Sequence, residues 1–371
     1  MYKKIKCSQL SLLKTIFSPL FFVCLFLLTS CASLDGTGII VVHADDSYFD
    51  ASDQSNDVIS FREFRWFAEK GLLAAGVYNF QRGIYQLDET LTISNDYISL
   101  VAHGHVEVRG KGRHSFPGMK LAASNVVVEG FSFSDLRHCI SNEENVPVND
   151  IVIRGLSAKN VKDCILVQSD KSSSSNRWLI SGFEINDYYR AGVRIKGRGV
   201  KNIKLESGII NGRSDSSYCW KGGVQVYQGA SNIRINELVI VNNIGECHDR
   251  YQQGDGIEVD NTTDEPRNIT ISNVYLSGNA DANLDIKSSK VTLENIFIDG
   301  VNSRSALKLW YYNYRCNNCY WSKESSYAIE LKHMSTFENN CSADSLNIIN
   351  RKVERSVIFD FTGDRDYVCL H

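Results

Sequence analysis

The segment Asp255-Gly-Ile-Glu-Val-Asp260 decides the fold, because related segments recur along the chain. In each copy two aliphatic residues alternate with two large polar or charged residues, which is the pattern of a β-strand with one buried and one outward face. Strands of this kind, stacked side by side, would present a charged groove. The other copies read AGVRIK from Ala191, GGVQVY from Gly222, ANLDIK from Ala282, SALKLW from Ser305 and YAIELK from Tyr327.

A second series of short strands runs in phase with the first. Asn232-Ile-Arg-Ile-Asn-Glu237 and Asn268-Ile-Thr-Ile-Ser-Asn273 belong to it, and each is followed by another alternating piece. The repeats are roughly 22 to 36 residues apart, with Asn and Gly at the corners, where left-handed backbone angles are tolerated. Each repeat therefore supplies about three short strands, and we predict an all-β, single-stranded solenoid.

This arrangement resembles the right-handed parallel β-helix of the pectin-lyase-like superfamily, from about Ile84 to about Phe361. Residues 57–70 have helical periodicity and are expected to form an N-terminal helical cap over the open end of the coil. We therefore expect residues 31–82 to form a linker and this cap, and residues 83–371 to form the parallel β-helix catalytic domain.

The N-terminus has the layout of a secretory signal peptide, which we assign to residues 1–30. Four lysines precede an apolar run over residues 16–28 that is too short to favour a membrane span. Leu28-Thr-Ser-Cys31 resembles a bacterial lipobox, which implies lipidation of Cys31, and Ala32 then favours the outer membrane. We expect an exported protein, either an outer-membrane lipoprotein that meets the membrane only through this lipid or a secreted or periplasmic protein cleaved without lipidation.

The charge of the chain argues against nucleic acid as a partner. The formal net charge is −3, and it becomes −7 when residues 1–30, with four lysines and no acids, are removed. Nucleic-acid binding requires clustered cations against phosphates. An anionic ligand would therefore be held by a local basic cluster, and we expect a monomer that binds no nucleic acid.

Eight cysteines remain when the three within residues 1–31 are set aside. An even set in an exported chain favours disulfides over metal or redox chemistry, so Cys316-Asn-Asn-Cys319 is not expected to be a zinc knuckle. Equivalent positions on neighbouring stacked strands lie about 4.8 Å apart, within disulfide range. On this ground we predict the pairs Cys139–Cys164 and Cys319–Cys341.

The outward residues of the repeated strands form two columns. Strand spacing places Glu258 about 4.8 Å from Asp285, and Asp260 about 7 Å along the strand from Glu258. Three carboxylates so close together either raise one pKa or recruit a cation such as calcium. The first column contains Leu166, Arg194, Gln225, Glu258, Asp285, Lys308 and Glu330, and the second contains Gln168, Lys196, Tyr227, Asp260, Lys287, Trp310 and Lys332.

The columns contain the groups that a uronate lyase requires. β-Elimination neutralises the sugar carboxylate, removes the C5 proton and protonates the leaving oxygen. The resemblance to β-helix polysaccharide lyases implies that Glu258, Asp260 and Asp285 hold calcium or polarise the substrate and that Lys287 is the base. The expected substrate is an acidic exopolysaccharide of a biofilm matrix or capsule, bound by Arg194, Lys196, Gln225, Tyr227, Lys308, Trp310 and Lys332.

Other functions remain open from the sequence. Glu258 and Asp260, about 7 Å apart, fall within the range of inverting glycosidases. Gly192-Val-Arg-Ile-Lys196 resembles the substrate-binding motif of polygalacturonases, but that family's Asn-Thr-Asp, Asp-Asp and Gly-His-Gly elements are absent, as is the Asp-Pro-His-Asp signature of alginate epimerases. A non-catalytic carbohydrate-binding or envelope protein, with its charges serving as cross-strand pairs on a solvated sheet, is the alternative of a different class.

Overall fold

A computed structural model describes residues 39–44, 58–170, 172–212, 218–247, 252–261, 264–322, 327–333, 335–340 and 367–369. The chain divides into two units, Met1–Gly38 and Ile39–His371, and every described residue belongs to the second. The predicted signal peptide and the predicted lipidation site Cys31 therefore lie outside the described residues. Within the part that is described, no helix combines the length and the apolar character needed to span a membrane.

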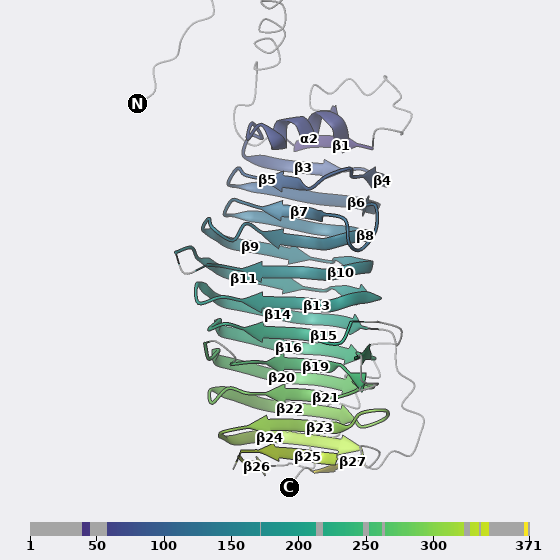
Figure 1. The fold of residues 1–371 in the computed structure, drawn as a ribbon. Helices are drawn as coiled ribbons and strands as arrows, with labels where there is room; N and C mark the ends of the chain where they lie inside the picture. The colour runs from purple at the N-terminus through teal and green to yellow at the C-terminus, as the bar shows by residue number, and fades with distance from the viewer. Residues whose placement is uncertain are drawn as a thin grey trace, which may run out of the picture. The chain divides into compact units, whose positions relative to one another are not determined.

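The second unit is a stack of coils in which each strand pairs in parallel with strands one coil away (Figure 1). Each coil contributes to three faces, as the repeats predict. The first face contains β5 (Leu91–Ile93), β7 (Pro117–Leu121), β13 (Tyr188–Lys196), β15 (Gly222–Tyr227), β19 (Asp255–Val259), β21 (Ala282–Ile286), β23 (Ser305–Trp310) and β25 (Tyr327–Lys332).

The other two faces share long strands that bend around a corner. The second face alone contains β1 (Ile39–His43), β3 (Gly76–Phe80), β9 (Val148–Arg154), β11 (Ser175–Ser181) and β26 (Thr336–Asn340), and the third alone contains β4 (Gly83–Gln86) and β12 (Glu184–Asn186). The strands shared by both are β6 (Ile98–Arg109), β14 (Val200–Asn211), β16 (Ser231–Val241), β20 (Arg267–Ser277), β22 (Val291–Asp299) and β24 (Asn313–Ser322).

Two strands connect this pair of faces to the first. β8 (Val126–Asn142) takes part in all three faces, and β10 (Ser157–Gln168) runs from the third to the first. Outside the parallel coils lie β2 (Val58–Ser60) beside β1, the antiparallel pair β17 (Gly245–Glu246) and β18 (Gln252–Gln253), and β27 (Tyr367–Cys369), which is antiparallel to β24. The stack thus includes β1 and β3, which precede residue 83.

The predicted helical cap is present as α2 (Phe61–Glu69). It begins at Ser60, whose Oγ accepts a hydrogen bond from the Glu63 amide at 3.2 Å, while the Glu63 carboxylate accepts one from the Ser60 amide at 2.8 Å. This reciprocal arrangement satisfies amides that the first helical turn leaves unpaired. The buried face of α2 brings Phe61 and Phe64 onto Phe80, and so covers the aromatic end of the core.

The aliphatic residues of the repeats form continuous inward ladders. Val224, Ile257 and Leu284 are opposite one another on neighbouring coils and are fully buried. The corners are made by residues in the left-handed region, such as Asn232 and Asn268 with φ of 57° and 54°. The Asn268 amide nitrogen also donates to the Asn232 side-chain oxygen at 3.0 Å, so corner asparagines stack between coils. The predicted parallel β-helix is therefore confirmed.

Three disulfides lie within the described residues. The predicted Cys139–Cys164 bond is confirmed and joins equivalent positions of β8 and β10, with the Cα atoms 4.6 Å apart. A second bond, Cys219–Cys247, ties the segment before β15 to the segment after β17. Such bonds fit a protein exported to an oxidising compartment.

The third disulfide corrects the sequence prediction for Cys319. Cys319 bonds to Cys316, three residues earlier, and not to Cys341, which lies outside the described residues. Both bonded cysteines are fully buried, and the chain turns between them at Asn318, whose φ is 63°. The corner directs both side chains inward, and a prediction based on equivalent positions of neighbouring coils does not consider partners within one corner.

Candidate functional site

The strand register places the first outward column as the sequence predicts. Glu258 is opposite Asp285, which in turn is opposite Lys308 on the next coil. Toward the N-terminus Glu258 is opposite Gln225, and Gln225 is opposite Arg194. In the second column Lys196 is opposite Tyr227, and Trp310 is opposite Lys332. The candidate residues thus occupy one outward face of the stack.

Lys287 lies at the centre of the predicted catalytic group. Its Nζ is 3.2 Å from a carboxylate oxygen of Asp285, 3.4 Å from one of Glu258 and 3.5 Å from one of Asp260. The structure therefore brings together all four residues that the sequence assigns to catalysis, with one ammonium group among three carboxylates.

A fourth carboxylate, Asp255, joins this group and was missed by sequence reasoning. Carboxylate oxygens of Asp255, Glu258 and Asp285 lie within 4.8 Å of one another. Strict alternation would point Asp255 inward with Ile257. However, a Cβ added to Gly256 would meet Leu276 and Asn283 in the interior, so Gly256 and Ile257 both face inward and Asp255 faces out. In the sequence, the glycine directly before the first aliphatic residue of the strand could have indicated that the alternation breaks there.

Polar side chains cover the carboxylates. The Tyr227 hydroxyl donates a hydrogen bond to Glu258, and the Trp310 indole donates one to Asp285 at 2.6 Å. The Gln225 amide nitrogen lies 3.3 Å from a Glu258 oxygen, while the side-chain oxygen of Gln225 is buried without a hydrogen-bond partner. One acceptor beside the carboxylates is thus left unsatisfied.

The burial of the column corrects the sequence analysis, which predicts that it faces solvent. Glu258, Asp285 and Lys308 are only 7%, 4% and 7% exposed. Long neighbouring side chains on the same face, above all Trp310, close over them, and Lys287 retains 19% of its side-chain surface. A ligand that approaches this face would first meet Lys287, Tyr227 and Trp310, and the carboxylates would act from beneath.

Burial sets the proton affinities of the group. Loss of water raises the pKa of Asp255, Glu258 and Asp285 above the ordinary carboxyl range, and Lys287 offsets this only in part for Glu258 and Asp285. For Lys287 burial alone would lower the pKa, but the carboxylates of Asp285 and Glu258 outweigh it and raise that pKa above its usual value. The cluster therefore holds Lys287 as an ammonium ion.

The predicted substrate-binding residues fall into two groups. The Arg194 guanidinium lies over the Tyr227 ring, 5.4 Å from its centroid, and Lys196 is 3.8 Å from Glu144. Lys308, by contrast, forms a buried ion pair with Asp281 at 2.5 Å, which occupies its charge within the protein.

Lys332 lies at the C-terminal edge of the group. It forms an ion pair with Glu330, and its Nζ is 5.9 Å from the centroid of the Trp310 ring. The same ring is 5.8 Å from Lys287 Nζ, so both ammonium groups lie near Trp310. Arg194, Lys196 and Lys332 thus flank the carboxylates on both sides.

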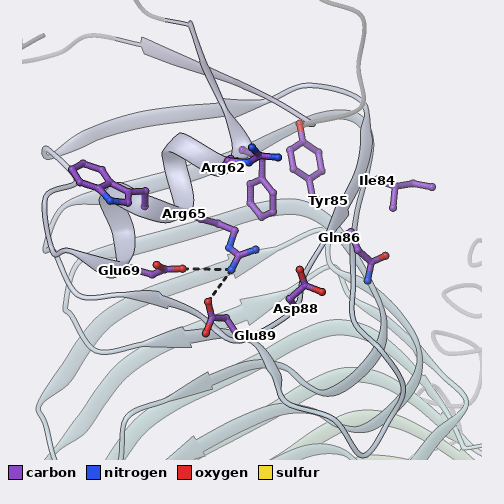
Figure 2. Close-up of a pocket in the computed structure, with 10 residues that line it drawn as sticks. Arg62, Arg65, Glu69, Ile84, Tyr85, Gln86, Asp88 and Glu89 are labelled. Atoms are coloured by element: carbon purple, nitrogen blue, oxygen red, sulfur yellow. Dashed lines mark hydrogen bonds and ion pairs between the residues drawn. The ribbon is translucent and has the colours of Figure 1, made fainter. Parts of the chain in front are cut away.

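A separate hollow of about 440 Å³ lies beside α2 at the N-terminal end of the stack (Figure 2). It is lined by residues that include Arg62, Trp66, Tyr85 and Asp88. Arg65 in its wall is 3.0 Å from Glu89 and 3.5 Å from Glu69. None of the predicted site residues lines this hollow, which lies several coils from β19.

No protein-family model and no curated protein matches this chain. Several solved structures do, and a rhamnogalacturonan lyase has a TM-score of 0.58 at 11% identity, over 82% of this chain and 88% of that one. The pectate lyase Pel9A has a TM-score of 0.55 at 10% identity, over 85% of this chain and 80% of that one.

Two viral proteins extend the comparison. A tailspike protein of E. coli bacteriophage HK620, in complex with a hexasaccharide, has a TM-score of 0.52 at 12% identity, over 83% of this chain and 60% of that one. ORF18 of Geobacillus virus E2 has a TM-score of 0.53 at 11% identity over 72% of this chain, which spans only 53% of that protein. At these identities the similarity shows the fold alone, a parallel β-helix.

Proposed function

We propose that this protein cleaves an acidic polysaccharide at the carboxylate cluster around Lys287. The observation that carries the proposal is the gathering of Asp255, Glu258 and Asp285 about one lysine on an outward face, with three further cations beside it. A stack that needed only a soluble face would not concentrate like charges where burial opposes their ionisation. Two lyases and an oligosaccharide-bound tailspike share the fold, which supports a carbohydrate substrate.

The reaction that we propose is β-elimination. Arg194 and Lys196 would bind uronate carboxylates on the N-terminal side of the cluster, and Lys332 would do so on the other side. Lys287 would be the base, and Tyr227 would return a proton to the leaving oxygen. Since the four neighbouring carboxylates hold Lys287 as an ammonium ion, it can act as a base only when their charge is neutralised by something else.

Calcium fits the residues that could provide this neutralisation. Calcium binds oxygen ligands at 2.3–2.6 Å, so ligands of one ion lie within about 5 Å of each other. The carboxylates of Asp255, Glu258 and Asp285 meet this limit, and the unpartnered Gln225 oxygen is a further hard donor beside them. Bound calcium would polarise a substrate carboxylate. In this proposal Asp255 takes the place that the sequence analysis gave to Asp260, which stays beside Lys287.

Hydrolysis is the second candidate, and one observation favours it. Burial raises the pKa of Glu258 and Asp285, and a raised carboxyl pKa favours the role of general acid for one of them. Asp260, beside the same lysine, could then activate a water molecule. In this reaction Lys287 would remain an ammonium ion throughout.

A single assay distinguishes the two reactions. Purified protein would be incubated with acidic exopolysaccharides, with calcium or with chelator, and followed for new reducing ends and for the ultraviolet absorbance of unsaturated uronates. We expect both signals to rise together, with calcium and increasingly at alkaline pH, because the base must lose its proton. Reducing ends alone would show a hydrolase, and binding without either signal would contradict catalysis.

We also propose that the protein is an outer-membrane lipoprotein, anchored through Cys31. The expectation rests on the lipobox-like Leu28–Cys31 segment and agrees with the three disulfides. Expressed in a Gram-negative host with an alkyne fatty acid, the full chain should become labelled and sediment with outer membranes. Cys31→Ser should lose both properties, and a labelled or membrane-bound Cys31→Ser protein would contradict this assignment.

A further inference from the structure

A second charged region lies on the coils N-terminal to the carboxylate cluster. The register places Arg137 on β8 level with Lys162 on β10, because Leu136 is opposite Val161 and His138 is opposite Asp163. On the next coil Val161 is opposite Tyr188 and Asp163 is opposite Ala191, so Lys162 is level with the pair Tyr189 and Arg190. Three successive coils therefore carry a cation at the same corner, and Arg194 follows on the first face.

This region contains more positive charge than the protein neutralises. Asp163, its one buried carboxylate, is occupied by Arg190, which donates from Nε at 2.7 Å and also from Nη2. Among the residues that the structure describes, Arg137, Lys162 and Arg194 have no ion-pair partner. The Nε of Arg194 is buried without a hydrogen-bond acceptor.

The cations of this region repel one another. Burial lowers the pKa of Lys162, and the nearby guanidinium groups of Arg190, Arg137 and Arg194 lower it further, against the single contribution of Asp163. Nothing in the packing of the coil requires these cations, because the inward residues of the same strands already complete the core. A cluster of this kind is relieved by an anion from outside the protein.

Aromatic rings extend the same region. Tyr189 packs edge-on against His114 with the ring centroids 4.9 Å apart, and it is 5.3 Å from Tyr218. The Arg113 guanidinium lies 5.2 Å from the centroid of the Tyr189 ring. Rings beside guanidinium groups suit a ligand that has both apolar faces and negative charges, and a pyranose chain with acidic substituents has both.

The spacing of the coils matches such a polymer. Neighbouring strands are separated by about 4.8 Å, which is close to the length of one pyranose residue in an extended chain. A polysaccharide lying along the stack would therefore advance by about one sugar for each coil. Arg194, Gln225 and Glu258 are opposite one another on consecutive coils, so the column of Arg194 leads into the carboxylate cluster. Lys162 lies at the corner, four residues before Leu166, which is opposite Arg194.

We propose that Arg137 and Lys162 bind anionic groups of a polysaccharide along the corner of the stack and that Arg194 binds the same chain where it crosses to the column of Glu258. This inference deepens the proposed function and rests on it for the role of Glu258. It makes the site asymmetric, with several anionic sugars held on the N-terminal side of the carboxylates. The ligand is a polysaccharide with regularly spaced carboxylate or sulfate groups, and a neutral glucan does not bind in the same way.

Binding can be measured apart from cleavage. Polygalacturonate, dextran sulfate, neutral dextran and duplex DNA would be titrated by calorimetry into the full chain carrying Glu258→Gln, so that turnover does not interfere. When Arg137→Ala and Lys162→Ala are added to this variant, the affinity for the polyanionic polysaccharides should fall about tenfold, and binding should depend less on salt. Comparing the affinity for polygalacturonate with that for dextran sulfate then shows whether the region prefers carboxylate or sulfate groups.

The control variant carries Lys201→Ala and Lys204→Ala, two exposed lysines of β14 on another face, and should bind as tightly as the parent. Equal binding by the Arg137/Lys162 variant and the parent would overturn the inference, as would equal binding of neutral dextran or tighter binding of DNA. If the tenfold loss is seen but wild-type protein cleaves no acidic polysaccharide, the binding site stands and the proposed function fails.

Discussion

Glu258→Gln is expected to reduce cleavage of the acidic polysaccharide at least about a hundredfold while the fold remains intact. The carboxylate is central to either reaction, because it is a cation ligand in the elimination and an acid or base in the hydrolysis. Glutamine keeps the volume of the side chain and can still accept the Tyr227 hydrogen bond. Lys287 keeps Asp260 and Asp285 as partners, so no buried charge is left alone.

The thermal stability of this variant separates catalysis from folding. Because one of the four crowded carboxylates is removed, the melting temperature should stay the same or rise. Glu330→Gln is the matched control, since Glu330 lies in the same column three coils from Glu258 and pairs with Lys332. Cleavage by this control should stay within a fewfold of wild type. Equal losses in both variants would show that the column contributes only to the general charge of the face.

The fold and its register were predictable from the sequence for a physical reason. The two-residue period of a strand and the burial of one face leave a single register in which Val224, Ile257 and Leu284 coincide. The same logic predicted Cys139–Cys164, because the cysteines are equivalent positions on neighbouring coils. It could not predict Cys316–Cys319, which depends on how one corner bends at Asn318.

The site was predictable in part, and the misses share a cause. Alternation placed Glu258, Asp285 and Lys287 together. It could not place Asp255 with them, because two consecutive residues, Gly256 and Ile257, face inward there and break the alternation. The pattern also could not show that Trp310 closes over the carboxylates, since the direction of a long side chain is set by its neighbours. Departures from strict alternation therefore decide which charges meet.

Stability of the fold below neutral pH is expected to depend on His138. Burial lowers the pKa of His138 from 6.5 to about 4, and Arg137 and Arg190 act in the same direction against Asp163. A lowered histidine pKa gives stability that is complete above pH 6.5 and is lost as the pH falls toward 4, because the unfolded chain takes up the proton first. At about 1.36 kcal/mol for each pH unit, the loss reaches about 3 kcal/mol at pH 4.

Comparison with His138→Gln isolates this contribution, because the buried carboxylates change stability with pH in the opposite sense. Their raised pKa values make Asp255, Glu258 and Asp285 stabilising as the pH falls, and they are common to both proteins. The unfolding free energy of wild type minus that of His138→Gln, from urea titrations, should therefore decrease by about 3 kcal/mol between pH 7 and pH 4. The same difference for His105→Gln, whose side chain is 64% exposed, should change far less. A flat difference for His138→Gln would mean that the folded and unfolded chains take up this proton equally readily, and that Asp163 compensates fully for the burial of the ring.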